Sequence, residues 1–301
     1  MPKINVTKVA HFSGHRDCIY ALEFSLQENC FYSGGSEGYI VEWNTITKGD
    51  GKLIVHVKKP IYSLLLNTNS QQLFCGTSTG NLHVIDLKEN LEIKNIEAHA
   101  LGLFDIKMLG EYFITSGGDG AIKIWNLHDF TLLKSIKASD KSARVIAINS
   151  ITKEFAVGFS DWRISIFNSE NFTLKKVLES HTNSVFSLCY SPNGNYLLSG
   201  GRDAILKVWD VKNNYQLLLE IPAHTLQIKC IAYNPTGNLF ATVSMDKTIK
   251  IWDADNFELL KVIDHPRNGS HINSVNKLIW TNDTQFITCS DDKQIMVWEV
   301  S

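Results

Sequence analysis

The sequence lacks the features that mark membrane, secreted and nucleic-acid-binding proteins. No apolar run reaches 18 residues, and the first 15 residues alternate polar and apolar types instead of forming a signal-peptide core. The 29 basic and 31 acidic residues give a net charge of −2 with no polybasic segment, which disfavours nucleic acid and anionic membranes as partners. These absences favour a globular protein of the cytoplasm.

The cysteine and glycine motifs of metal and nucleotide sites are missing as well. The six cysteines stand singly in apolar stretches with no C-x-x-C pair, so neither zinc ligation nor a disulfide framework is indicated. The segments "SGGSEG" and "SGGDG" are rich in glycine, but no Lys-Ser/Thr pair and no helical pattern follows them. We therefore expect no metal ion and no cofactor.

One pattern recurs along the whole chain. In "SGGRDAILKVWD", Ser199 stands four residues before Asp203, and Asp203 stands six residues before Trp209. The same frame gives seven matches, which end at Trp43, Ile85, Trp125, Phe167, Trp209, Trp252 and Trp298. Successive matches are 40 to 46 residues apart, and so regular a period indicates one array of a repeated unit. We expect residues 1–301 to form a single domain.

Each repeat contains four short segments of alternating polar and apolar residues, separated by turn residues. A histidine precedes the first segment in five repeats, at His15, His99, His181, His224 and His271. Val57 and Ser139 stand at this place in the second and fourth repeats, where the frame has also decayed. Four strands in about 40–45 residues are typical of a propeller blade.

The chain resembles the WD-repeat family over essentially its full length. "VWDV" and "IWDA" carry the Trp-Asp pair, and "IWNL", "VWEV" and "EWNT" are close variants. The resemblance implies an all-β protein, a seven-bladed β-propeller of four-stranded antiparallel blades. Because the last repeat stops after its third strand, we expect the N-terminal strand, about residues 3–12, to complete the last blade and remove the open edges.

The resemblance also implies that the recurring polar residues form a structural tetrad in each blade. A buried imidazole and a buried indole N–H need partners, which an aspartate and a hydroxyl supply. The predicted tetrads are His15–Ser33–Glu37–Trp43, His99–Thr115–Asp119–Trp125, His181–Ser199–Asp203–Trp209, His224–Thr242–Asp246–Trp252 and His271–Thr288–Asp292–Trp298. In the last of these, Cys289 and His265 are the alternatives to Thr288 and His271. A hydrolase also uses Ser, His and Asp, but it needs one exposed serine, so repetition favours structure over catalysis.

Residues that differ between blades are the candidates for binding. The loops that carry the histidines and the turns that carry the aspartates are expected on one face of the ring, called the top face below. The predicted partner-binding residues on this face are Arg16, Lys58, Trp162, Arg163, Arg202, Met245 and Asp291. Trp162 stands in a turn where sister repeats carry Gly, Ala or Lys. It is either an exposed binding anchor or a side chain folded against its own blade.

These features predict a non-catalytic scaffold that binds a protein or a peptide on the top face. It would act as a monomer or as a subunit of a larger complex, with neither nucleic acid nor membrane as its partner. The alternatives are an enzyme or a metal site in the central channel of the ring, and, with less support, nucleic-acid binding.

Overall fold

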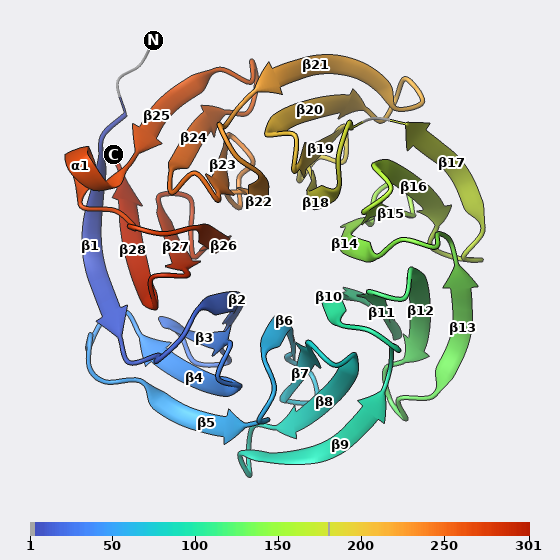
Figure 1. The fold of residues 1–301 in the computed structure, drawn as a ribbon, viewed down its shortest axis with the longest axis horizontal. Coiled ribbons are helices and arrows are strands. Elements are labelled where there is room, and N and C mark those ends of the chain that lie inside the picture. The colour runs from blue at the N-terminus through green and yellow to red at the C-terminus, as the bar shows by residue number, and fades with distance from the viewer. Residues whose placement is uncertain (1–3, 180) are drawn as a thin grey trace.

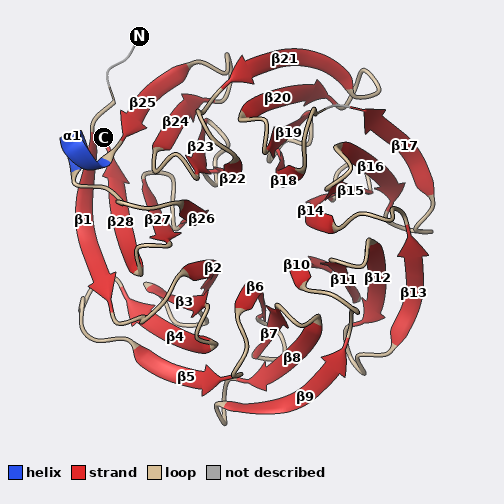
Figure 2. Ribbon diagram, in the orientation of Figure 1, coloured by secondary structure: helices blue, strands red, loops and turns tan. Residues whose placement is uncertain are grey.

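The computed structural model describes residues 4–179 and 181–301, and its strands form a closed ring of seven antiparallel sheets (Figure 1). Each sheet, or blade, has four strands, which run from the channel outward in chain order in six of the seven. Strands supply nearly all the regular structure, with one short helix at the edge of the ring (Figure 2). The predicted seven-bladed β-propeller is confirmed.

The first three blades come from the first half of the chain. Blade 1 contains β2 (Ile19–Phe24), β3 (Cys30–Gly35), β4 (Tyr39–Asn44) and β5 (Lys52–His56). Blade 2 contains β6 (Ile61–Asn67), β7 (Gln72–Thr77), β8 (Asn81–Asp86) and β9 (Leu91–Glu97). Blade 3 contains β10 (Leu103–Leu109), β11 (Tyr112–Gly117), β12 (Ala121–Asn126) and β13 (Leu132–Lys137).

The remaining blades follow around the ring. Blade 4 contains β14 (Ala143–Asn149), β15 (Glu154–Phe159), β16 (Arg163–Asn168) and β17 (Leu174–Glu179). Blade 5 contains β18 (Val185–Tyr190), β19 (Tyr196–Gly201), β20 (Ile205–Asp210) and β21 (Gln216–Pro222). Blade 6 contains β22 (Ile228–Tyr233), β23 (Leu239–Ser244), β24 (Ile249–Asp253) and β25 (Leu259–Ile263). Blade 7 contains β26 (Val275–Trp280), β27 (Gln285–Ser290), β28 (Gln294–Val300) and β1 (Val6–Ser13).

The two ends of the chain meet in blade 7. Strand β1 pairs antiparallel with β28, from Val6 opposite Val300 to Ser13 opposite Gln294 (Figure 1). Beyond the strands, Asn5 and Ser301 exchange two backbone hydrogen bonds of 2.7 and 2.9 Å. The predicted closure by the N-terminal strand is therefore confirmed, while Lys3 of the predicted segment lies outside the described residues. This pairing covers the outer edge of β28 and gives blade 7 the same four strands as the other blades.

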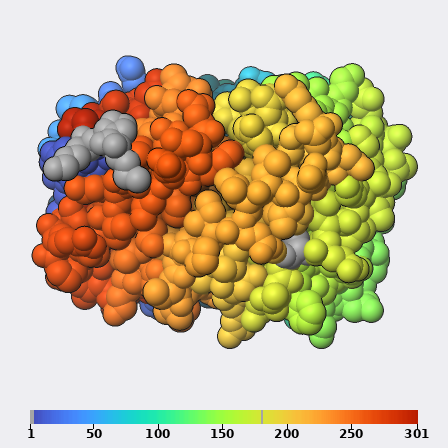
Figure 3. Space-filling view, turned by 90° about the horizontal axis from the view of Figure 1, so that it is seen from above, coloured from blue at the N-terminus to red at the C-terminus, as the bar shows by residue number. Residues whose placement is uncertain are grey.

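The hydrophobic core lies between neighbouring blades. One cluster joins Ile122 and Ile124 of β12 to Phe155 and Val157 of β15, all of them fully buried. Every strand exposes alternate side chains to its two faces, so each blade can contact both neighbours at once. The blades pack continuously along the side of the molecule (Figure 3). Because each buried Ile or Phe contributes about 1.5–3 kcal/mol, contacts between blades hold the ring together.

The connection between β25 and β26 holds α1 (His265–Asn268), the one helix in the part of the chain that the structure describes. Asp264 caps its N-terminus by accepting from the Arg267 backbone N–H, and Gly269 ends it with a left-handed backbone. This extra turn accounts for the longest of the repeat spacings, 46 residues between Trp252 and Trp298.

Candidate functional site

The structure brings the four members of each predicted tetrad together. In blade 5, Nδ1 of His181 lies 2.9 Å from the Asp203 carboxylate, and Nε2 lies 2.8 Å from Ser199 Oγ. The indole N–H of Trp209 donates to the same Ser199 oxygen at 2.9 Å. Because a carboxylate only accepts, His181 carries its proton on Nδ1, and the serine hydroxyl donates to Nε2. Every polar side-chain group of this tetrad thus has a hydrogen-bond partner.

Blades 3, 6 and 7 repeat this geometry. Their histidines, His99, His224 and His271, lie 2.8, 2.8 and 2.9 Å from the threonine oxygens and 2.9 to 3.1 Å from the carboxylates. In blade 7 the indole N–H of Trp298 donates to Thr288 at 3.0 Å. Thr288 and His271 therefore occupy the tetrad positions, and Cys289 and His265 do not.

Blade 1 forms the same hydrogen-bonded tetrad, with a glutamate in place of the aspartate. His15 lies 2.6 Å from Ser33 Oγ and is hydrogen-bonded to Glu37, and Trp43 donates to Ser33 at 2.7 Å. In the aspartate blades, one carboxylate oxygen also accepts from the backbone N–H that follows the histidine, as Thr182 shows at 3.0 Å. Among the described residues Oε2 of Glu37 has no partner, which leaves blade 1 with the less complete network.

The tetrads are buried, and burial and hydrogen bonds shift the pKa values of several of their side chains. Burial lowers the pKa of His99 and of His224, against the opposing attraction of their carboxylates. Burial by itself would raise the pKa of Asp119, but hydrogen bonds from Ala100 and His99 lower it overall. At neutral pH the His99–Asp119 and His224–Asp246 pairs each consist of a neutral imidazole and an ionised carboxylate. The five tetrad hydroxyls have no exposed surface, so none of them can reach a substrate: Ser33, Thr115, Ser199, Thr242 and Thr288.

Blades 2 and 4, where the frame decays, are held differently. In blade 2 the tetrad places are taken by buried Val57, Cys75 and Ile85. In blade 4, Ser139 donates to Asp161 at 2.6 Å, and Arg163 donates to the same carboxylate at 2.5 and 3.1 Å. Arg163, one of the predicted partner-binding residues, thus pairs with the carboxylate that a histidine contacts in the tetrads, and its side chain stays partly exposed.

The other predicted partner-binding residues lie at the histidine loops and the aspartate turns. Arg16, Lys58 and Arg202 are exposed, and Met245 exposes 47% of its surface. Asp291 is half-buried, and its carboxylate accepts from Asn276 Nδ2 at 2.7 Å.

Trp162 occupies a turn position with a left-handed backbone, at a φ of 75°. Glycine stands at the corresponding place in three blades, as Gly38, Gly80 and Gly120. About half of the tryptophan, 53%, is exposed, so its own blade covers only part of the side chain. A bulky residue with a positive φ is unusual, because the left-handed conformation brings Cβ close to the following carbonyl.

The structure also reveals a ring of residues that the sequence analysis missed. In every blade the pairing of the first and second strands skips the second residue of the first strand, which forms a β-bulge. We call these residues the bulge ring: Tyr20, Tyr62, Phe104, Arg144, Phe186, Lys229 and Asn276. A bulge turns its side chain away from the sheet face and often lies beside a functional site. The signal in the sequence was their position, five residues after each histidine or its replacement.

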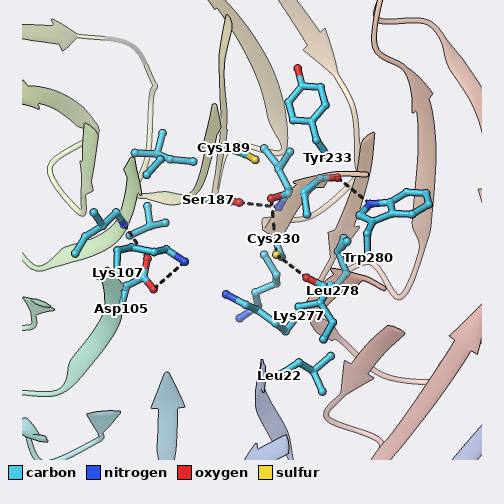
Figure 4. Close-up of a pocket in the computed structure, with 18 of the residues that line it drawn as sticks. Leu22, Asp105, Lys107, Ser187, Cys189, Cys230, Tyr233, Lys277, Leu278 and Trp280 are labelled. Carbon is cyan, nitrogen blue, oxygen red and sulfur yellow. Dashed lines mark hydrogen bonds and ion pairs between the residues drawn. The ribbon is translucent and has the colours of Figure 1, made fainter. Parts of the chain in front are cut away.

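A cavity of about 540 Å³ lies within the channel, lined by residues of the first strands. Lys107 and Lys277 extend into it, and Asp105 lies 3.6 Å from Lys107 (Figure 4). Burial raises the pKa of Cys189 to about 11, so this thiol is protonated at neutral pH. Among the described residues, no three His, Cys, Asp or Glu side chains are arranged to hold a metal ion.

Comparison with known families and proteins agrees with this geometry. The family described as "WD domain, G-beta repeat" matches four segments, residues 6–44, 172–210, 215–253 and 257–299, which make up more than half of the chain. The chain belongs to the WD40 repeat family. Each matched WD40 repeat is offset from the blades, since residues 172–210 run from β17, the outer strand of blade 4, through the three inner strands of blade 5.

Several WD40 relatives are similar over part of the chain. Periodic tryptophan protein 2 homolog of Mus musculus is 25% identical over 67% of this chain and 24% of its own length. WD repeat-containing protein 90 of Xenopus tropicalis is 30% identical over 44% of this chain and 8% of its own length. THO complex subunit 6 homolog of Danio rerio is 26% identical over 51% of this chain and 54% of its own length. The chain thus spans little more than half of these relatives at most.

Within residues 4–179 and 181–301, no helix has the length and apolar character needed to cross a membrane.

Proposed function

We propose that this WD40 ring is a non-catalytic, single-domain platform that binds a protein or a peptide on its top face. The observation that carries the proposal is the contrast between its two sets of polar residues. The tetrads recur in five blades and are buried, whereas the exposed residues of the same loops and turns vary along the ring, as Arg16, Lys58, Trp162, Arg202 and Met245 do. A repeated residue serves the ring, and a unique exposed residue is free to serve recognition.

Closure of the ring supports the same function. The loops of the top face stand on β-strands that are paired throughout, so their relative positions are set before a partner arrives. A preorganised surface loses less conformational entropy on binding than a flexible one. One relative is named as a homolog of THO complex subunit 6, which fits a role in assembly with other proteins. The predicted cytoplasmic location belongs to this proposal as well.

The alternatives from the sequence have less support. The cavity in the channel contains lysines and carboxylates in near balance, and its Cys189 thiol is not activated. The net charge of −2 does not favour nucleic acid. No specific observation among the described residues favours either alternative over the binding platform.

Affinity capture with matched variants tests the proposal. Trp162→Gly combined with Arg202→Ala removes two unlike exposed groups of the top face, and glycine suits the positive φ at position 162. The control combines Ile151→Ala with Lys212→Ala, which removes an exposed apolar residue and a cation from turns of the opposite face. We expect wild type and control to capture the same partner and the top-face variant to lose it, with all three equally folded. A partner that survives the top-face change, or that only the control loses, contradicts the proposal.

A further inference from the structure

Side chains of the bulge ring contact one another from blade 1 to blade 6. The rings of Tyr20 and Tyr62 are 5.7 Å apart between centroids, and Tyr62 stacks on Phe104 at 5.7 Å. The Arg144 guanidinium then lies 4.3 Å from the centroid of the Phe104 ring and 5.4 Å from that of Phe186. Lys229 Nζ follows at 5.8 Å from Phe186. The bulge ring is therefore aromatic over blades 1 to 3 and carries its cations over blades 4 to 6.

The place of the bulge ring is at the top of the channel. Each member is the second residue of a first strand, immediately after a histidine loop. All seven members are partly exposed. Phe186 and Lys229 also line the channel cavity, so the ring lies where the top face meets the channel.

The two cations of the ring have no carboxylate of their own. Among the described residues, neither Arg144 nor Lys229 has an acidic oxygen within 4.0 Å; the nitrogen Nε of Arg144 donates to Ser160 Oγ at 2.8 Å. Asp291, which lies beside the ring in the turn of blade 7, accepts from Asn276. Burial lowers the pKa of both Arg144 and Lys229, and repulsion from Arg144 lowers that of Lys229 further, against the attraction of Asp291. The two cations are thus partly shielded from water, and no carboxylate of the described residues pairs directly with either of them.

A cationic ligand does not fit this arrangement. The faces of Phe104 and Phe186, which would attract a lysine or arginine of a partner, are already covered by Arg144. A third positive charge would also be repelled by Arg144 and Lys229. Arg144 and Lys229 lie 5.4 and 5.8 Å from the centre of the same Phe186 ring, so an anion beside that ring would be attracted by both. Arg202, which stands just before the aspartate turn of blade 5, adds a third exposed cation on the same side.

We propose that the bulge ring is a subsite for an anionic side chain of a bound peptide, a carboxylate or a phosphate, held between Arg144 and Lys229. The inference rests on the proposed peptide-binding function of the top face and names the chemistry that it selects. The stacked pair Tyr62 and Phe104 offers an apolar surface beside the anion, so a neighbouring aliphatic or aromatic residue of the peptide has a place to pack.

Peptide pools with one fixed central residue test the selectivity. The probes carry Glu, phosphoserine, Gln or Lys at the centre of otherwise randomised decapeptides, and binding to the full chain is measured by fluorescence anisotropy. We expect the Glu or the phosphoserine pool to bind at least about tenfold more tightly than the Gln and Lys pools. Preference for phosphoserine over Glu identifies a phosphate as the ligand group, and equal binding or preference for Glu identifies a carboxylate.

Variants separate this subsite from general electrostatic attraction. Arg144→Gln combined with Lys229→Met should abolish the preference for acidic pools. The control, Lys153→Met with Lys212→Met, removes two lysines from turns of the opposite face and should keep it. Lys229→Glu alone should shift the preference toward the Lys pool, which shows that an altered subsite still binds. Unfolding temperatures establish that the variants are folded.

The outcomes distinguish this inference from the proposed function. Wild type that binds all four pools equally, or prefers the Lys or Gln pool, overturns the anionic subsite. If in addition a captured partner is lost from the Trp162 and Arg202 variant, the binding platform stands and only the subsite fails. If no pool binds and no partner depends on the top face, both proposals fail together.

Discussion

The hydroxyl of Ser199 lies 2.8 Å from Nε2 of His181, although 18 residues separate them in the chain. The serine is on the second strand of blade 5, and the histidine is in the loop before the first strand. Their hydrogen bond therefore ties a loop of the top face to the middle of its own blade. The same relationship recurs in the other blades with a complete tetrad.

Removing this histidine should destabilise the ring. We expect His181→Ala to lower the free energy of unfolding by about 1–3 kcal/mol, because Ser199 and Asp203 lose a buried partner. Ser139→Ala, at the same place in blade 4, should have a smaller effect, because Arg163 still pairs with Asp161. Denaturant unfolding of both variants measures the difference. If His181→Ala unfolds like wild type, the tetrad of blade 5 has no stabilising role.

The closing strand should be needed for solubility. Deletion of residues 2–12 removes most of β1, exposes the edge of β28, and uncovers Phe31 and Trp43, against which Phe12 packs. We expect the truncated chain to elute as aggregates in size-exclusion chromatography. Val9→Ala, a change at an exposed position of β1, serves as the control and should stay monomeric. A truncated protein that remains monomeric and equally stable would show that closure is dispensable.

Two glycines separate the effect of a clash from that of backbone strain. A Cβ added at Gly120 would lie 2.1 Å from the Ser139 carbonyl oxygen, whereas one added at Gly110 would meet nothing within 4 Å. Both glycines have a positive φ, of 75° and 58°. We expect Gly110→Ala to lower the free energy of unfolding by about 1–2 kcal/mol and Gly120→Ala to lower it by clearly more. If calorimetry shows that both variants lose the same free energy of unfolding, the turn at Gly120 relaxes freely and the clash costs nothing.

The folded ring should lose stability as the pH falls below the ordinary pKa of histidine. His99 and His224 have a lower pKa in the folded protein than the ordinary value of 6.5, chiefly through burial. Below that pH the unfolded chain binds more protons than the folded one, so stability falls as the pH falls. The lowered pKa of Asp119 acts in the same direction below about 3.8.

The measurement is the unfolding temperature at pH 7.5, 6.5 and 5.5 at constant ionic strength. We expect a progressive decrease, and a shallower decrease in His224→Leu, which lacks one of the buried imidazoles. An unfolding temperature that is constant or rises on acidification contradicts the assignment of neutral, buried histidines.

The blade pattern was predictable because it depends on local residues that repeat. The seven positions that end the repeated frame, occupied by Trp, Ile or Phe, predicted a third strand in every blade. Because the last repeat lacks a fourth strand, the sequence also predicted that the N-terminal segment supplies it. The tetrad residues stood out for the same reason, since a hydrogen bond repeated in several blades needs the same side chains at the same intervals. Even the decayed blades kept their strands, because burial of Val57 and Phe167 replaces the missing polar contacts.

What the sequence by itself determined is therefore the architecture: seven units, their strands and the residues common to them. The tertiary structure alone decided which unlike residues meet. Arg144 and Phe104 are 40 positions apart and belong to different blades, and each lies at a β-bulge that is recognised only from the pairing of the strands. A repeat specifies its own blade, but contacts around the channel arise only when the ring closes and brings every first strand to one axis.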